Sequence, residues 1–293
     1  LLLLLLLLSG PSAATTIVAV RYGRGPSGGV VVGADTRTSA GGYVSNRFAA
    51  KLTFVLDRET DAFVDDDQHG CSDKNDNDDN DNKKNHDESA GNRERESKSE
   101  SESDWSNDQA AAAAAAAAPP SEASTCCVCR SGSAADTQAL ADAVRTDLLN
   151  RQLSKGRRGT VTAAARLLQG MIRNDPDLSA SLICAGYDHG RGEGCIYSIS
   201  PGGTAMEEPK YAVQGSGSGY IYGYLEAGIN GDGAVSREKE EGGVEEWNED
   251  DAVEFVARVV GLAVERDGSS GGFCRIFAIN RDGKKEYTRV LHR

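Results

Sequence analysis

An abrupt change of composition divides this 293-residue chain and limits which parts can form a packed core. Residues 59–125 carry 19 acidic and 6 basic side chains, together with Asp/Asn runs and eight alanines at 111–118. Such a stretch buries too little apolar surface to offset the entropy lost on folding, so we expect it to be disordered. The rest of the chain holds 26 acidic and 26 basic side chains, so the net charge of −13 is local and no basic patch favours nucleic-acid binding.

Strand-like and helix-like segments alternate on both sides of this stretch. Apolar, β-branched runs predict strands at residues 18–22, 30–34, 51–56, 126–130, 182–187, 195–199, 211–213, 273–279 and 287–291. Helical periodicity appears at residues 133–151, 162–173, 220–227 and, most clearly, 249–266. Strands at both ends with paired helices between them predict two sheets covered by helices, a layered α+β domain.

The first fourteen residues imitate a secretory signal peptide, with Leu1–Leu8 ahead of the small residues at 12–14. The run is a homopolymer and has no basic leader, so we expect residues 1–14 to be a propeptide or a gene-model remnant. We expect one domain over residues 15–293, interrupted by the acidic insert 59–125. No stretch reaches the roughly 18 apolar residues that a membrane span requires.

Seven cysteines form no evident paired framework. Cys126, Cys127 and Cys129 cluster, but a second Cys/His pair at zinc spacing is missing, and His69 and His86 lie in low-complexity sequence. We therefore expect a reducing compartment, no metal site and no cofactor.

Thr15 opens a β-branched strand at Thr15–Val20. If the chain is cut before Thr15, this residue supplies a hydroxyl and a free amine, hence nucleophile and base together. Taken singly, Thr15 is also compatible with an ordinary strand residue, and Asp35 and Lys51 with a plain ion pair.

Several blocks in a fixed order favour the catalytic interpretation. They are Thr15–Val20, GADTRT at 33–38, Asn46-Arg47 with Lys51-Leu52-Thr53, CRSGSAADTQA at 129–139, GSGSGYIYGY at 215–224 and ERDGSSGG at 265–272. Together they resemble a eukaryotic proteasome β subunit, most closely the caspase-like beta-1 type. The resemblance covers about residues 15–58 and 128–291.

This resemblance implies a four-layer αββα sandwich, the fold of the N-terminal-nucleophile hydrolases. It implies a threonine-type endopeptidase that acts in ubiquitin/proteasome-dependent protein degradation in cytoplasm and nucleus. The partners would be other α and β subunits in stacked seven-membered rings, and the substrates polypeptides.

The resemblance also implies roles for individual residues. Thr15 would be the nucleophile, Lys51 the catalytic lysine, Asp35 its ionic partner, and Gly132 the donor of an N–H to the developing oxyanion. The accessory residues around the threonine amine would be Ser216, Asp267 and Ser270.

A substrate pocket is implied by Arg130, which matches the residue that gives the beta-1 type its preference for acidic side chains. A guanidinium would form a bidentate pair with a substrate Glu or Asp, although an arginine at a strand end can also be purely structural. Thr36 and Ala49 would contribute to the same pocket, where the family often has threonine at the position of Ala49.

Two departures leave alternatives open. The processing site is Ala14–Thr15, where active members have Gly before the threonine, and Gly adopts tight backbone conformations most easily. Impaired processing would give a proteolytically silent structural β subunit.

The acidic insert stands where the family has a tight turn. It is either a solvated loop, whose closure costs little entropy, or a retained intron. A simpler bacterial peptidase of the same superfamily is a third interpretation, less favoured because of Arg130 and the 215–224 block.

Overall fold

The computed structural model describes residues 15–40, 43–57, 123–156, 158–231 and 243–291. The predicted propeptide and most of the acidic insert lie outside these ranges. The expectation of disorder up to residue 125 is wrong at its end, because Ala123, Ser124 and Thr125 are buried and lead into a strand. Residues 41–42, 157, 232–242 and 292–293 also lie outside the described residues.

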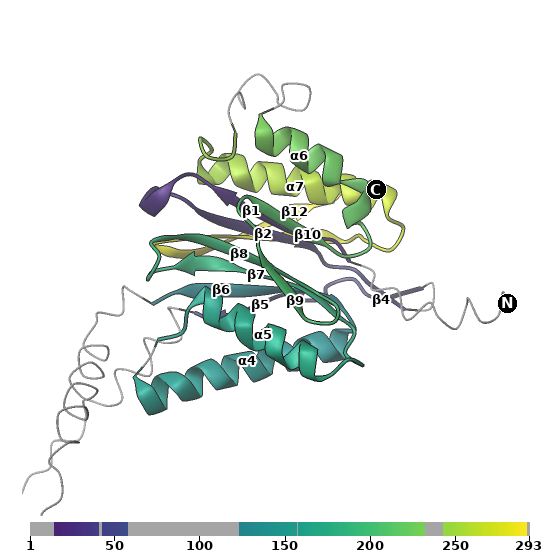
Figure 1. Ribbon diagram of the computed structural model, residues 1–293. Helices are drawn as coiled ribbons and strands as arrows, with labels where there is room; N and C mark the ends of the chain where they lie inside the picture. The colour runs from purple at the N-terminus through teal and green to yellow at the C-terminus, as the bar shows by residue number, and fades with distance from the viewer. Residues whose placement is uncertain (1–14, 41–42, 58–122, 157, 232–242, 292–293) are drawn as a thin grey trace, which may run out of the picture.

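Two five-stranded antiparallel sheets form the centre of the molecule (Figure 1). The first has the order β10-β1-β2-β11-β12. Its strands are β1 (Ile17–Tyr22), β2 (Gly29–Asp35), β10 (Tyr211–Gln214), β11 (Phe273–Asn280) and β12 (Gly283–Val290). The second has the order β5-β6-β7-β8-β9. Its strands are β5 (Leu52–Leu56), β6 (Thr125–Gly132), β7 (Ala180–Asp188), β8 (Glu193–Ser200) and β9 (Thr204–Glu207).

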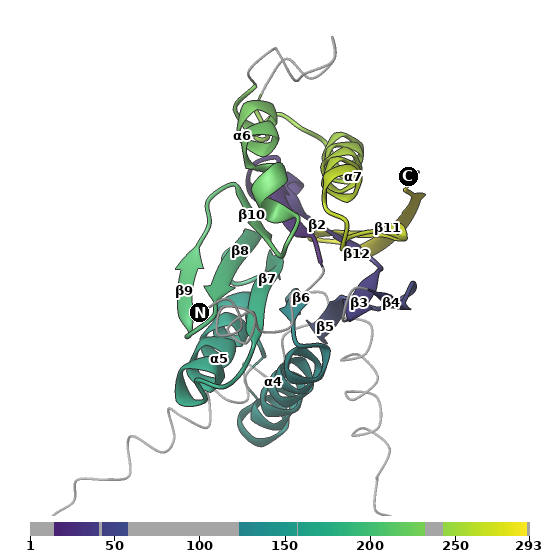
Figure 2. The same ribbon diagram turned by 90° about the vertical axis from the view of Figure 1, so that its right-hand side faces the viewer.

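Helices cover the outer face of each sheet, as both ribbon views show (Figures 1 and 2). The pair α6 (Tyr222–Asn230) and α7 (Glu249–Arg266) lies on the first sheet, and α4 (Ala134–Lys155) and α5 (Val161–Asn174) lie on the second. The predicted four-layer αββα sandwich is confirmed. Among the described helices, none combines the length and apolar character needed to cross a membrane.

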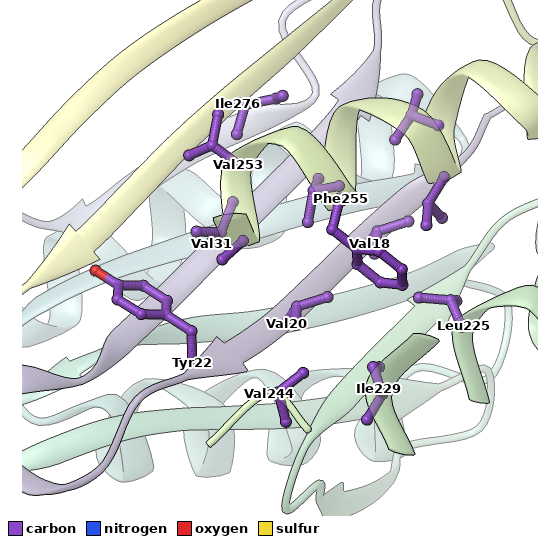
Figure 3. Close-up of a cluster of buried hydrophobic side chains, with 14 of the residues drawn as sticks. Val18, Val20, Tyr22, Val31, Leu225, Ile229, Val244, Val253, Phe255 and Ile276 are labelled. Atoms are coloured by element: carbon purple, nitrogen blue, oxygen red, sulfur yellow. The ribbon is translucent and has the colours of Figure 1, made fainter. Parts of the chain in front are cut away.

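The first four residues of strand β1, Ile17 to Val20, are apolar and buried because both faces of the strand are covered there. Val18 and Val20 belong to the core beneath α6 and α7, whereas Ile17 and Ala19 face the second sheet. This division follows the two-residue repeat of a strand. Figure 3 shows Val18 and Val20 beside Phe255, the large aromatic side chain of α7.

The ends of two helices fix segments that matter for the site. Ser133 caps α4 by accepting the Asp136 N–H, directly after β6 ends. Helix α7 begins with a capping box between Asn248 and Asp251 and ends at Asp267. The two-stranded ribbon of β3 (Thr38–Ala40) and β4 (Tyr43–Asn46) follows β2. The sequence patterns predicted neither this ribbon nor β9.

Candidate active site

Thr15 lies two residues before the start of β1 and is 6% exposed. Its backbone nitrogen donates to Ser216 Oγ at 3.1 Å. The Ser216 hydroxyl lies 2.6 Å from Asp267 Oδ2 and 3.3 Å from the Thr15 carbonyl. A hydroxyl has one proton, and the shorter contact assigns it to the carboxylate. Ser216 therefore presents a lone pair to the Thr15 nitrogen.

Gly215 allows the chain to approach Thr15 this closely. Its φ is +98°, and a Cβ at this position would lie 2.1 Å from the Thr15 carbonyl oxygen. Any larger residue would push either the 215–218 turn or Thr15 out of place. The block GSGS thus has a steric reason for its first glycine.

The Asp267 carboxylate joins the serines predicted to surround Thr15. Besides Ser216, Oδ2 accepts the Ser270 hydroxyl at 2.6 Å, and Oδ1 accepts the Ser269 N–H at 3.0 Å. Burial alone would raise the pKa of Asp267, but the hydrogen bonds from Ser216, Ser270 and Ser269 and the charge of Lys51 outweigh it, so this pKa is lowered. Asp267 is therefore ionised at neutral pH.

Asp35 and Lys51 form a buried ion pair, with Lys51 Nζ 2.7 Å from Asp35 Oδ1. Asp35 ends β2, and Lys51 directly precedes β5 of the other sheet. Burial lowers the pKa of Lys51, and the Asp35 carboxylate opposes this shift. The structure thus brings together the predicted lysine and its predicted partner.

Thr16 connects these two groups, and the sequence patterns did not indicate its role. Its N–H donates to Asp35 Oδ1 at 2.9 Å, and its hydroxyl lies 2.9 Å from Ser270 Oγ. The side chain is fully buried. One continuous hydrogen-bonded set therefore runs from Lys51 through Asp35 and Thr16 to Ser270, Asp267 and Ser216. The repeated threonine at 15–16 was the only sequence signal for it.

Arg37 is a second residue that the sequence patterns missed. Its N–H donates to Asp35 Oδ2 at 3.2 Å, and the Gly271 N–H donates to the same oxygen at 2.8 Å. The guanidinium lies over Gly271, where a Cβ would be 2.3 Å from Arg37 Cζ. Arg37 thereby fastens the loop that carries Ser270 to the end of β2.

Gly132 ends β6 with a φ of +122°. A Cβ here would lie 2.2 Å from the Ser179 carbonyl oxygen, so the backbone itself requires glycine at this position. This steric demand comes from Ser179, the residue directly before β7.

A cleft of about 940 Å³ opens beside these residues. Gly132, Gly215 and Ser216 line it together with residues of β8, β9 and β10, among them Tyr211, and with Glu208 of the β9–β10 connection. Among the described residues, no group of three or more His, Cys, Asp or Glu side chains is placed to hold a metal ion. The polar groups at the cleft are hydroxyls, backbone amides and isolated charges.

Arg130 lies outside the lining of this cleft, on the side of Lys51. Its N–H donates to the Lys51 carbonyl at 2.8 Å, and its guanidinium donates to the Ala50 carbonyl. Burial lowers the pKa of Arg130, and its buried Nε has no hydrogen-bond partner among the described residues. The guanidinium is thus desolvated and incompletely bonded.

Thr36 and Ala49 lie next to one another near this arginine. The Ala49 N–H donates to the Thr36 carbonyl at 2.9 Å. The Thr36 hydroxyl donates to the Arg47 carbonyl at 2.7 Å and accepts the Phe273 N–H at 3.0 Å. In this structure the hydroxyl of Thr36 therefore holds backbone segments together.

Comparison with known proteins agrees with this geometry. A family model described as "Proteasome subunit" matches residues 123–279. The chain belongs to the proteasome subunit family. It is 32% identical over 270 residues to the probable proteasome subunit beta type-1 of Schizosaccharomyces pombe, covering 92% of this chain and 81% of that protein. It is 30% identical to the proteasome subunit beta type-6 of Arabidopsis thaliana, covering 93% and 80%, and 29% identical to the beta type-1 subunit of Saccharomyces cerevisiae, covering 93% and 86%.

These relatives confirm the resemblance to a proteasome core β subunit, a member of a family of proteases. Their alignments cover 92–93% of this chain, so the similarity extends to both sides of the acidic insert. The geometry then indicates which residues of this family member could perform chemistry.

Proposed function

We propose that this chain is a catalytic β subunit of the proteasome core particle, a threonine endopeptidase that cleaves after acidic residues. The observation that carries the proposal is the 3.1 Å hydrogen bond from the Thr15 nitrogen to Ser216, which is itself anchored on Asp267. The nitrogen required as a base already lies within a network of polar groups.

The proposed reaction begins when the peptide bond before Thr15 is cut. Until then the nitrogen is an amide and cannot accept a proton. A free α-amine has a pKa near 8, and the positive charge of Lys51 in the same network would lower it further. The amine would take the proton of the Thr15 hydroxyl as Oγ attacks the substrate carbonyl carbon.

The tetrahedral intermediate would place negative charge on the carbonyl oxygen, near the Gly132 N–H. As the C–N bond breaks, the α-ammonium would return its proton to the departing amine and leave an ester on Thr15. A water molecule, deprotonated by the same amine, would hydrolyse that ester and regenerate the hydroxyl.

Arg130 supports a preference for acidic side chains before the scissile bond. Its guanidinium is half-buried and incompletely hydrogen-bonded, and it lies beside the Lys51 segment. A carboxylate from the substrate would pair with this half-exposed cation and offset its partial desolvation.

The test uses the chain assembled in its core particle. N-terminal sequencing should show a mature chain that begins at Thr15, and an epoxyketone should label that residue. Thr15→Ala should abolish hydrolysis of a peptide with Glu before the cleaved bond, whereas Thr15→Ser should retain part of it. Particles in which the assembled chain still begins upstream of Thr15 would contradict the proposal.

Ala14 favours one alternative, a structural β subunit whose processing is blocked. Ala14→Gly would then create activity that the parent chain lacks, with equal incorporation into particles.

We further propose that the chain acts in cytoplasm and nucleus, which imaging of a fluorescently tagged chain would test.

A further inference from the structure

The polar side chains of Gln214 and Ser181 meet between the two sheets, at the cleft beside Thr15. Gln214 is the last residue of β10 in the first sheet, and Ser181 is the second residue of β7 in the second sheet. Both residues line the cleft. Strands β10 and β7 lie against one another (Figure 2), so the two residues belong to facing surfaces.

The two-residue repeat of a strand directs both side chains into the space between the sheets. Ala212, two residues before Gln214, belongs to the apolar core between the sheets. Ile183, two residues after Ser181, belongs to the same core. This core therefore ends at the cleft with one polar residue on each strand. Burying such groups costs free energy unless they are hydrogen-bonded.

The Gln214 amide makes two hydrogen bonds to β7. Its Oε1 accepts the hydroxyl of Ser181, and its Nε2 donates to the Leu182 carbonyl at 3.3 Å. A carboxamide suits this position because it carries an acceptor and donors in one group. Gln214 thus forms a hydrogen-bonded bridge from β10 to β7.

One end of this bridge lies next to the groups that hold Thr15. Gly215 and Ser216 follow Gln214 directly in the chain. Gly215 approaches the Thr15 carbonyl, and Ser216 accepts the Thr15 N–H. Gln214 itself pairs with Ile17 of β1. The position of β10 therefore determines where the Thr15 nitrogen lies.

The other end of the bridge lies next to the proposed oxyanion donor, Gly132. Ala180, directly before Ser181, pairs with Gly132 in the register of β6 and β7. The Ser133 N–H donates to the Ser179 carbonyl at 2.8 Å. The start of β7 therefore holds the chain at Gly132 and directly after it.

We propose that Gln214 is a positioning residue that sets the distance between the Thr15 nucleophile and the Gly132 N–H. The inference rests on the proposed threonine peptidase function. Lys51 and Asp35 also join the two sheets, in the buried interior, whereas Gln214 joins them at the cleft. The Gly132 N–H would act on charge that develops in the transition state, so displacing it lowers kcat and leaves substrate binding intact.

The experiment compares Gln214→Met with the parent chain in the assembled particle, using a peptide with Glu before the cleaved bond. Methionine has a similar length and lacks the amide. We expect kcat to fall roughly tenfold, while KM stays at the parental value. An unchanged kcat, or a rise of KM as large as the fall of kcat, would overturn the inference.

Ser181→Ala removes the hydroxyl at the other end of the bridge. It should lower kcat in the parent chain and cause no further loss in Gln214→Met, because the bridge is already absent there. The matched control is Gln138→Met, since the Gln138 amide donates to Asp142 at 2.9 Å within α4. This control should keep the parental kcat and KM.

Urea denaturation of the same full-length variants tests the bridge without any peptidase activity. Ser181→Ala should lower the urea midpoint of the parent chain and leave that of Gln214→Met unchanged. Equal midpoint shifts in both backgrounds would contradict the bridge and the inference with it. A parent chain that hydrolyses no peptide would instead contradict the proposed function, and the urea measurement would still decide whether the bridge exists.

Discussion

Lys51 Nζ lies 2.7 Å from Asp35 Oδ1, and this ion pair joins the ends of two different sheets in the interior of the molecule. Asp35 is held by N–H groups of Thr16, Arg37 and Gly271. These three N–H groups fix the orientation of the Asp35 carboxylate. The Lys51 ammonium group therefore has one defined position beside it.

Removing one partner of this pair should be costly, because it leaves an uncompensated buried charge. We expect Asp35→Asn to lower the free energy of unfolding by about 3–5 kcal/mol. Urea denaturation of the full-length chain measures it. The control is Glu254→Gln, which breaks the exposed pair with Arg289 and should cost less than about 1 kcal/mol. Equal losses in both variants would contradict a special role for the buried pair.

Gly215 sets the position of Thr15, so Gly215→Ala should disturb the site without touching a reactive group. A Cβ there collides with the Thr15 carbonyl at 2.1 Å. We expect labelling of Thr15 by an epoxyketone to fall at least about tenfold, as expected for a displacement on the order of 1 Å. Gly219→Ala in the same turn meets no atom within 4 Å and should label normally. Normal labelling of both variants would show that the close approach is unimportant.

Arg130 should determine the preference for acidic substrates. Arg130→Met removes a charged hydrogen-bond donor, and we expect a loss of about 10- to 100-fold in kcat/KM for a peptide with Glu before the cleaved bond. Arg130→Lys keeps the charge without the planar fork and should fall between parent and Met variant. Thr15 labelling reports on the intact nucleophile. An unchanged ratio of acidic to neutral substrates would refute the assignment.

Asp267 should make stability depend on pH at the acid end. Because its pKa is lower in the folded chain than the ordinary 3.8, its stabilisation is complete above about pH 4 and is lost as pH falls through the folded-state pKa. The difference in unfolding free energy between parent and Asp267→Asn should therefore shrink on acidification. Urea denaturation at a series of pH values measures it. A difference in unfolding free energy that grows toward low pH would contradict the lowered pKa of Asp267.

Phe255 organises the core under α6 and α7. It is 1% exposed, and its ring centroid lies 4.8 Å from that of Trp247. We expect Phe255→Ala to cost about 3–5 kcal/mol and to change the emission of Trp247. The control Leu153→Ala, at a side chain that is 56% exposed, should stay within about 0.5 kcal/mol.

Segments with strong local signals could be predicted from the sequence. The helix predicted at 249–266 is α7, because an apolar face, a capping box and a stop at Asp267 all coincide there. The helix predicted at 133–151 continues to Lys155, because Gly156, with a φ of +59°, ends it. Strands β3, β4 and β9 are only three or four residues long, and no apolar alternation marks them as strands.

The site was predictable only in part. Family resemblance placed Thr15, Lys51 and Asp267 together, since positions so far apart in sequence carry no local signal of their proximity. The roles of Thr16 and Arg37 depend on hydrogen bonds across the fold, which no pattern along the chain encodes. The demand for glycine at 132 likewise arises from a residue far along the chain, Ser179 directly before β7.

Strands β6 and β7, of eight and nine residues, act as spacers between the two ends of the sandwich. At about 3.3 Å per residue they hold these ends roughly 25 Å apart, about three screening lengths at physiological ionic strength. Exposed charge at the end of the sandwich where β6 begins therefore has little electrostatic effect on a peptide beside Thr15. Charged residues can therefore accumulate at that end of the sandwich without altering the chemistry at Thr15.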